Sequence, residues 1–93
     1  MHSRGQKNPI LVVEDEASIR EGLEDVLVFH GYLPTGVGTG TEGLEKALAG
    51  GWDLILLDVM LPGINGFDIC KGVRAQNPQV PIILLTAKGA EED

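Results

Sequence analysis

Four polar side chains that could do chemistry follow apolar runs of the sequence, at the point where each run ends. They are, in chain order, Glu14, Asp15, Asp58 and Thr86, and the runs cover residues 10–13, 54–57 and 82–85. Runs of Ile, Val and Leu without polar alternation are typical of strands that are buried on both faces of a parallel sheet. Because such sheets bind ligands beyond the carboxyl ends of their strands, we expect the four side chains to share one site.

The three carboxylates of this group predict a cation site. If the first and third strands are neighbours, about 4.8 Å separates their backbones, and Asp58 lies close to Glu14 and Asp15. Carboxylates that close repel one another, and one of them would take up a proton unless a positive charge compensates. Oxygen ligands with room for several waters favour Mg²⁺ as that charge. For Asp15 alone, the alternative is a helix N-cap, a common role for an Asp after a strand.

The same arrangement makes Asp58 the candidate nucleophile. A carboxylate beside Mg²⁺ can attack phosphorus and form an aspartyl phosphate. Asp58 ends the most apolar run, which we expect in the middle of the sheet, and turn-forming residues follow it at 61–63 and 65–66. The metal would offset charge on the phosphoryl oxygens, and the hydroxyl of Thr86 would bind one of them.

The stretch between the first and third strands begins with an amphipathic helix and continues as an edge strand. Its apolar stripe at helical spacing consists of Ile19, Leu23, Val26, Leu27 and His30. Gly31 then stands where a left-handed cap would end the helix. Residues 32–37 indicate a weaker strand, and we expect it at a sheet edge because Pro34 cannot donate a ladder hydrogen bond.

Two further helices complete the pattern. One is predicted over residues 41–49, with Thr41 as its N-cap and two glycines after it, and the other over residues 66–75, ended by Asn77-Pro78. The element order is therefore β-α-β-α-β-α-β, which predicts a doubly wound α/β domain with a parallel sheet.

Composition limits the class of protein. The 93 residues carry 14 acidic and 7 basic side chains, a net charge of −7. This charge argues against nucleic-acid binding, which needs clustered Lys and Arg, and it fits a cation site, although acidic surfaces also aid solubility.

No apolar run approaches the roughly 20 residues that a membrane span needs. Residues 1–9 lack the apolar core of a signal peptide, so we expect a cytoplasmic protein without a membrane partner. The single Cys70 is expected to be a small core residue.

Three segments resemble the receiver domains of bacterial response regulators. They are Ile10-Leu11-Val12-Val13-Glu14-Asp15-Glu16, then Asp58-Val59-Met60-Leu61-Pro62-Gly63-Ile64-Asn65-Gly66, then Pro81-Ile82-Ile83-Leu84-Leu85-Thr86-Ala87-Lys88. With Gly31-Tyr32 and Glu42-Gly43-Leu44 they cover nearly the whole chain in the family's order. The resemblance implies a flavodoxin-like three-layer sandwich with sheet order 2-1-3-4-5, which also places the strand of Pro34 at an edge.

The resemblance implies specific roles in two-component signalling. Asp58 would accept the phosphoryl group of a histidine kinase's phosphohistidine. Asp15, Asp58 and the backbone carbonyl of Met60 would contact Mg²⁺, and Glu14 would complete the acidic pocket through water. Thr86 would move toward the phosphoryl group and change the signalling face. Such a domain is a phosphoacceptor and no turnover enzyme, and the resemblance allows a C-terminal output domain in the full-length protein.

Relative to the family, the chain stops before the fourth helix, the fifth strand and the fifth helix. We therefore expect a flexible segment over residues 1–8 and an incomplete receiver domain over residues 9–93, with sheet order 2-1-3-4. The family's phosphoryl-neutralising Lys is missing, and Lys88 does not match it, so we expect slow or absent phosphorylation. We also expect self-association through the uncovered edge of the fourth strand.

Other functions fit the residues less well. One alternative is a receiver-like interaction module that binds metal without being phosphorylated. Covalent phosphatases of the haloacid dehalogenase type need a second Asp two residues after the nucleophile, where this chain has Met60. Residues 38–43 match the dinucleotide pattern G-x-G-x-x-G, but they follow the second strand and lack the acidic partner. His30, at the end of the first helix, is more simply explained by the helix dipole than as a phosphorelay histidine.

Overall fold

Four parallel strands and three helices alternate along residues 8–85, the part of the chain that the computed structural model describes. The elements are β1 (Pro9–Val13), α1 (Ala17–Phe29), β2 (Leu33–Val37), α2 (Gly40–Ala49), β3 (Leu54–Asp58), α3 (Gly66–Gln76) and β4 (Ile82–Leu85). The predicted order of strands and helices is confirmed.

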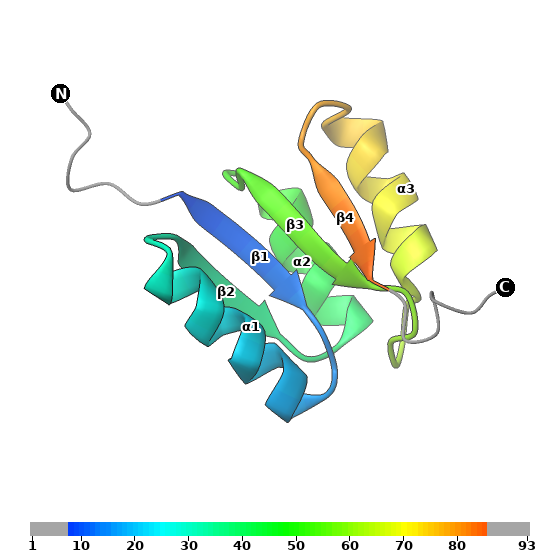
Figure 1. Ribbon diagram of the computed structural model, residues 1–93. Coiled ribbons are helices and arrows are strands. Elements are labelled where there is room, and N and C mark those ends of the chain that lie inside the picture. Colours follow the sequence, from blue (N-terminus) through cyan, green and yellow to red (C-terminus); the bar gives the residue numbers. More distant parts are fainter. Residues whose placement is uncertain (1–7, 86–93) are drawn as a thin grey trace, which may run out of the picture.

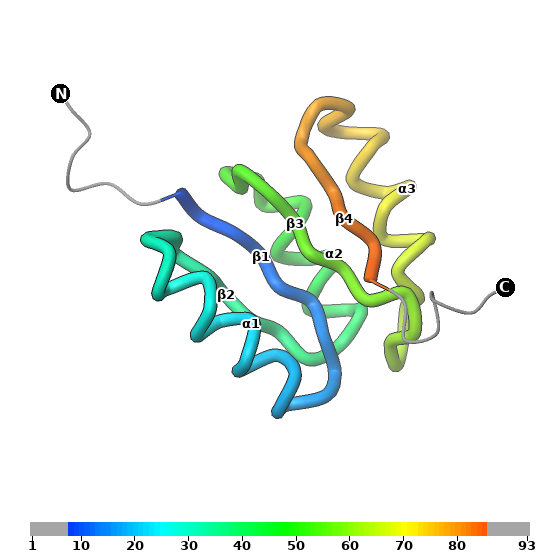
Figure 2. The backbone as a smooth tube through the Cα atoms, viewed as in Figure 1, coloured from blue at the N-terminus to red at the C-terminus, as the bar shows by residue number. Residues whose placement is uncertain are grey.

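The strands form one sheet in the order β2-β1-β3-β4, as expected (Figure 1). The chain path in Figure 2 shows the two crossovers that place β1 between β2 and β3. In register, Val13 of β1 pairs with Leu57 of β3, so the two strands end side by side. β2, which contains Pro34, is an edge strand, where a missing backbone donor costs no ladder hydrogen bond.

Helices cover both faces of the sheet, which gives the three layers of a flavodoxin-like sandwich (Figure 1). The larger core lies under α2 and α3. Its buried members are Leu11, Val13, Val37, Ala47, Ile55, Leu57, Ile69, Val73 and Val80, and Cys70 packs against them partly buried. The smaller core, under α1, consists of Ile10, Val12 and Leu56. Alternate residues of β1 and β3 thus enter different cores, because successive side chains point to opposite faces of a strand.

Only the middle of the predicted stripe on α1 is packed. Leu23 and Leu27 contact the smaller core, whereas Ile19 and Val26 are 49% and 56% exposed and His30 is also exposed. α1 therefore buries a narrower face than its periodicity predicts, because within residues 8–85 no further element covers its outer flank. None of the helices in this range is long and apolar enough to cross a membrane.

The start of α2 differs from the prediction. The helix begins at Gly40, and Thr39 is its N-cap, with Oγ1 accepting a hydrogen bond of 3.1 Å from the backbone N–H of Glu42. The prediction of Thr41 as the N-cap is therefore wrong. Both threonines are suitable caps by residue type, and local preference alone does not distinguish them.

α1 ends as predicted, with Gly31 in the left-handed region at φ +90°. The backbone N–H of Gly31 donates to Val28 O at 3.0 Å, and that of Tyr32 donates to Leu27 O at 2.9 Å. This pair of hydrogen bonds is the Schellman motif, which satisfies carbonyls that the helix leaves free at its end.

The substitution Gly31→Ala should lower the free energy of unfolding by about 1–2 kcal/mol, because an L-residue is strained at this φ. The matched control is Gly22→Ala within α1, where a Cβ meets nothing within 4 Å. This control should raise stability by about 0.5–1 kcal/mol through helix propensity. Urea denaturation followed by circular dichroism measures both changes, and effects of the same sign would contradict this account of the helix end.

Candidate metal centre

The ends of β1 and β3 bring three carboxylates together. Glu14, Asp15 and Asp58 each offer a carboxylate oxygen, and these oxygens lie within 4.8 Å of one another. Glu14 and Asp58 are only 6% and 8% exposed, whereas Asp15 is exposed. The backbone N–H of Glu14 donates to Val37 O at 3.1 Å, which extends the β1–β2 pairing as far as the site. The convergence that the apolar runs predict is therefore present in the structure.

Burial raises the pKa of Glu14 above its usual value of 4.5. The hydrogen bond from the backbone N–H of Glu16 to Glu14 Oε2, 3.0 Å long, acts in the opposite direction, and the negative charges of Asp58 and Asp15 raise the pKa further. The charged form of Glu14 is thus less favoured than in an unfolded chain. A cation would reverse this, because an adjacent positive charge favours the carboxylate.

Asp15 does not cap α1, so the alternative role considered for it is not observed. The N-cap position is Glu16, and it makes no side-chain cap hydrogen bond. Instead, Asp15 lies on the short connection between β1 and α1, and its exposed side chain belongs to the carboxylate group.

Arg20 contributes to this connection, and the sequence pattern does not identify it. Its Nη1 donates to the backbone carbonyl of Glu14 at 2.9 Å, across the first turn of α1. The only signal in the sequence is a basic residue one turn into the helix, which is also common on solvated faces. The structure shows that this side chain holds the backbone from which Glu14 and Asp15 project.

Asp58 is held by the start of the loop that follows it. The backbone N–H of Met60 donates to Asp58 Oδ1 at 3.2 Å. The N–H of Val59 donates to Leu85 O at 3.0 Å, which ties the start of the loop to β4, and the N–H of Gly66, the first residue of α3, donates to Val59 O at 2.9 Å, which ties the end of the loop to its start. A local hydrogen bond between a side chain and the backbone two residues on limits rotation of the carboxylate.

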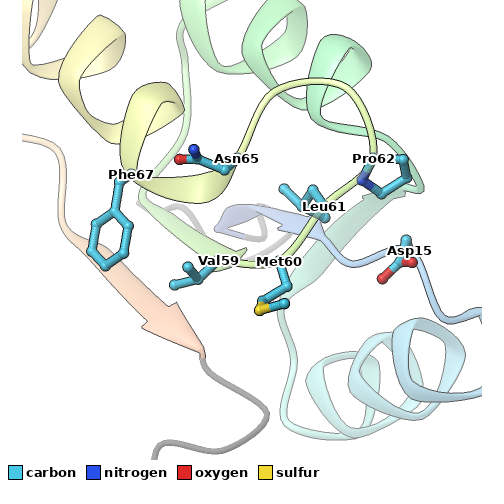
Figure 3. Close-up of a pocket in the computed structure, with 7 residues that line it drawn as sticks. All are labelled: Asp15, Val59, Met60, Leu61, Pro62, Asn65 and Phe67. Carbon is cyan, nitrogen blue, oxygen red and sulfur yellow. The ribbon is translucent and has the colours of Figure 1, made fainter.

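A pocket of about 580 Å³ opens beside the carboxylates (Figure 3). Its lining residues are Asp15, Val59, Met60, Leu61, Pro62, Asn65 and Phe67. Figure 3 shows Asp15 on one side of the pocket and Phe67, at the start of α3, on the other. Most of the lining comes from the loop after Asp58, so the position of that loop determines the shape of the site.

The fourth residue predicted for the site, Thr86, lies outside the described residues, as does Lys88. Leu85, the last residue of β4, pairs with Asp58 in the sheet. Within residues 8–85, the site therefore consists of three carboxylates and the loop backbone at residues 59–65. These are hard oxygen donors, the type that suits Mg²⁺ or Ca²⁺ and not a thiolate-binding metal.

Residues 10–93 match the family model of the response regulator receiver domain. The uncharacterized transcriptional regulatory protein YkoG of Bacillus subtilis is 46% identical over 88 residues, which are 95% of this chain and 39% of YkoG. The chain thus spans less than half the length of this relative.

Solved structures show the same fold. The response regulator TrrA of Thermotoga maritima, in complex with Mg²⁺-BeF, has a TM-score of 0.82 and 41% identity over 86% of this chain and 70% of that chain. TrrA in complex with the histidine kinase ThkA gives a TM-score of 0.79, over 86% of this chain and 69% of that chain. The receiver domain of the sensor histidine kinase PA1611 of Pseudomonas aeruginosa, with a magnesium ion in its active site cleft, gives 0.86 and 35% identity, over 94% of this chain and 73% of that chain.

The raised pKa of Glu14 predicts a pH-dependent cost in the metal-free protein. The folded state holds the proton to higher pH than the unfolded chain, so the cost is absent well below pH 4.5, grows as the pH rises, and is complete above the raised pKa. Glu14→Gln should therefore raise stability at about pH 7 and change it little near pH 3. Thermal unfolding in EDTA measures this, with the exposed Glu21→Gln as control. Equal stabilisation at both pH values would contradict it.

Proposed function

The chain belongs to the receiver domain family of two-component response regulators, and from this premise we propose that Asp58 is its phosphoacceptor. The observation that carries the proposal is the group of three carboxylate oxygens within 4.8 Å, with Asp58 buried at the end of an interior strand. Such a group is expensive to bury without a function, because each added negative charge raises the cost of the others.

In the proposed reaction, an oxygen of the Asp58 carboxylate forms a bond to the phosphorus of a histidine kinase's phosphohistidine. The P–N bond breaks, and its electron pair stays on the imidazole nitrogen, which gains a proton from solvent. The bond from Met60 N–H to Oδ1 orients the carboxylate for attack. Thr86, by the family pattern, would donate its hydroxyl to a phosphoryl oxygen and so report phosphorylation to the signalling face.

Asp15, Asp58 and the backbone carbonyl of Met60 would hold Mg²⁺, and Glu14 would contact it through water. The cation would offset both the carboxylate charges and the charge on the phosphoryl oxygens. Support comes from the all-oxygen donor set, from the raised pKa of Glu14, and from the magnesium in the structures of TrrA and PA1611. These observations favour Mg²⁺ over a site held together by hydrogen bonds alone.

The partners follow from the same proposal. TrrA was solved with the histidine kinase ThkA, and YkoG is named as a transcriptional regulatory protein. We propose that this chain receives its phosphoryl group from a histidine kinase in the cytoplasm and signals to an output domain. Residues 9–93 would be the receiver portion; residues 1–8, of which the structure describes only Asn8, would precede it. A module that binds metal without phosphorylation is not favoured, because the described acidic residues are all present.

Mass spectrometry tests the phosphoacceptor. With Mg²⁺ and a small phosphodonor over a long incubation, the chain should gain one phosphoryl group, and Asp58→Asn should gain none. The matched control is Asp53→Asn, an exposed Asp before the opposite end of β3, which should label as the wild type does. A label that persists in Asp58→Asn would refute Asp58 as the acceptor. Mg²⁺ binding without any label would mean that the chain keeps the metal site without the chemistry, which both the expected loss of phosphorylation and the interaction module predict.

Self-association is a further part of the proposal. β4 is the last strand of the sheet among residues 8–85, and its Ile83 is 50% exposed. An apolar edge strand of this kind can pair with a second chain. Light scattering across a concentration range should show a dimer or larger species, and Ile83→Lys should shift it toward the monomer. Phe29→Lys, on the 84% exposed Phe29 of α1, is the control. A wild-type monomer at every concentration would contradict the proposal.

A further inference from the structure

A backbone contact outside the carboxylate group ties the loop after Asp58 to the start of α2. The N–H of Gly40 donates to Pro62 O at 3.0 Å. Gly40 is the first residue of α2, and the first N–H groups of a helix have no partner within it. Thr39 satisfies one of these groups, that of Glu42, with its side chain. The loop carbonyl of Pro62 satisfies another, so the loop itself acts as part of the helix cap.

The contact requires glycine for reasons of space. A Cβ at Gly40 would lie 2.8 Å from both Ile64 N and Ile64 C, and closer still to Ile64 O. All three are backbone atoms, so no side-chain rotation relieves the overlap. Gly40 is not among the glycines with positive φ, and its conformation is therefore open to other residues. Any larger residue must push the loop away from the helix.

Elsewhere the loop is held mainly at its ends. The N–H of Met60 donates to the Asp58 carboxylate. The N–H of Val59 donates to the carbonyl of Leu85, and the N–H of Gly66 donates to the carbonyl of Val59. Its middle, residues 62–64, lies against α2 at Gly40 and beside Thr41, whose Oγ1 is 3.0 Å from a Cβ built on Gly63. Met60 stands between the fixed start of the loop and this middle contact. The position of its backbone thus depends on both.

We propose that Gly40 is a positioning residue of the metal centre: its close contact with residues 62–64 sets the position of the Met60 backbone beside Asp15 and Asp58. The inference rests on the proposed function, which gives the backbone carbonyl of Met60 to Mg²⁺. It also accounts for part of the G-x-G-x-x-G pattern of residues 38–43, because its second glycine is required by the neighbouring loop and not by a nucleotide.

Calorimetric titration of the 93-residue chain with Mg²⁺ tests the inference. Gly40→Ala should weaken Mg²⁺ binding by about tenfold, as expected when the support of a ligand is lost. Two controls should stay within about twofold of the wild type, because neither touches the loop. Gly22→Ala makes the same exchange of glycine for alanine in α1, where the added Cβ meets nothing within 4 Å. Ala47→Gly weakens α2 at a buried position away from Gly40. An equal loss in Ala47→Gly, or unchanged binding in Gly40→Ala, would overturn the inference.

A second measurement needs no variant and decides the matter if Gly40→Ala fails to fold. If loop position and Mg²⁺ binding are coupled, Mg²⁺ must stabilise the loop contact in return. Amide hydrogen exchange at Gly40 N–H should slow on adding Mg²⁺, while exchange at Gly50 N–H, bonded to Ala47 O at the other end of α2, stays constant. No change at Gly40 in protein that binds Mg²⁺ would overturn the inference.

Mg²⁺ binding by Asp58→Asn tests the proposed metal centre independently of the role of Gly40. If Asp58→Asn binds Mg²⁺ as tightly as the wild type, the assignment of the metal centre is wrong, whatever Gly40→Ala does. If Asp58→Asn loses binding and Gly40→Ala keeps it, the metal centre stands and only the role of Gly40 is lost.

Discussion

The mutual repulsion of three carboxylates, forced together by the parallel pairing of β1 and β3, is the constraint on which the rest of this structure depends. Backbone hydrogen bonds fix the spacing of the two strands, so Asp58 cannot withdraw from Glu14 without breaking the central ladder. Burial increases the cost, and the raised pKa of Glu14 reports it. A positive charge at that point would offset all three carboxylates together, which is the physical ground for the proposed cation site.

The two cores keep this unfavourable arrangement in place. Val13 and Leu57, which precede the carboxylates, are fully buried under α2 and α3, while Val12 and Leu56 pack on the α1 side. A shift of either strand end would therefore have to repack both faces of the sheet, and close-packed interiors resist such changes. The hydrophobic burial of the strands thus stabilises an electrostatically costly edge. This separation of roles, with a rigid apolar sheet below and a site formed by strand ends and loops above, is typical of α/β folds.

The loop after Asp58 is less constrained than the strands, and glycines determine its position by allowing close backbone contacts. Gly40 and Gly66 leave no room for a Cβ because backbone atoms of the loop or of β3 lie against them. Gly31 is different, since a positive φ at the end of α1 requires it. The site thus combines side chains held by strands with a backbone segment held by close contacts to the starts of α2 and α3. A receiver that must change shape on phosphorylation would draw its moving parts from such segments.

The sequence by itself determined the strands, their succession along the chain and the edge position of the Pro34 strand, because apolar runs, periodicity and the missing donor of a proline are local signals. The sheet order, which makes the first and third strands neighbours and so brings Glu14, Asp15 and Asp58 together, followed from the resemblance to the receiver family and not from the pattern alone. Other features were decided only by the tertiary structure: Thr39 instead of Thr41 as the cap of α2, the narrow buried face of α1, and the contacts of Arg20 and Gly40. Each of these depends on which atoms of distant segments come into contact, and neither residue type nor spacing along the chain carries that information.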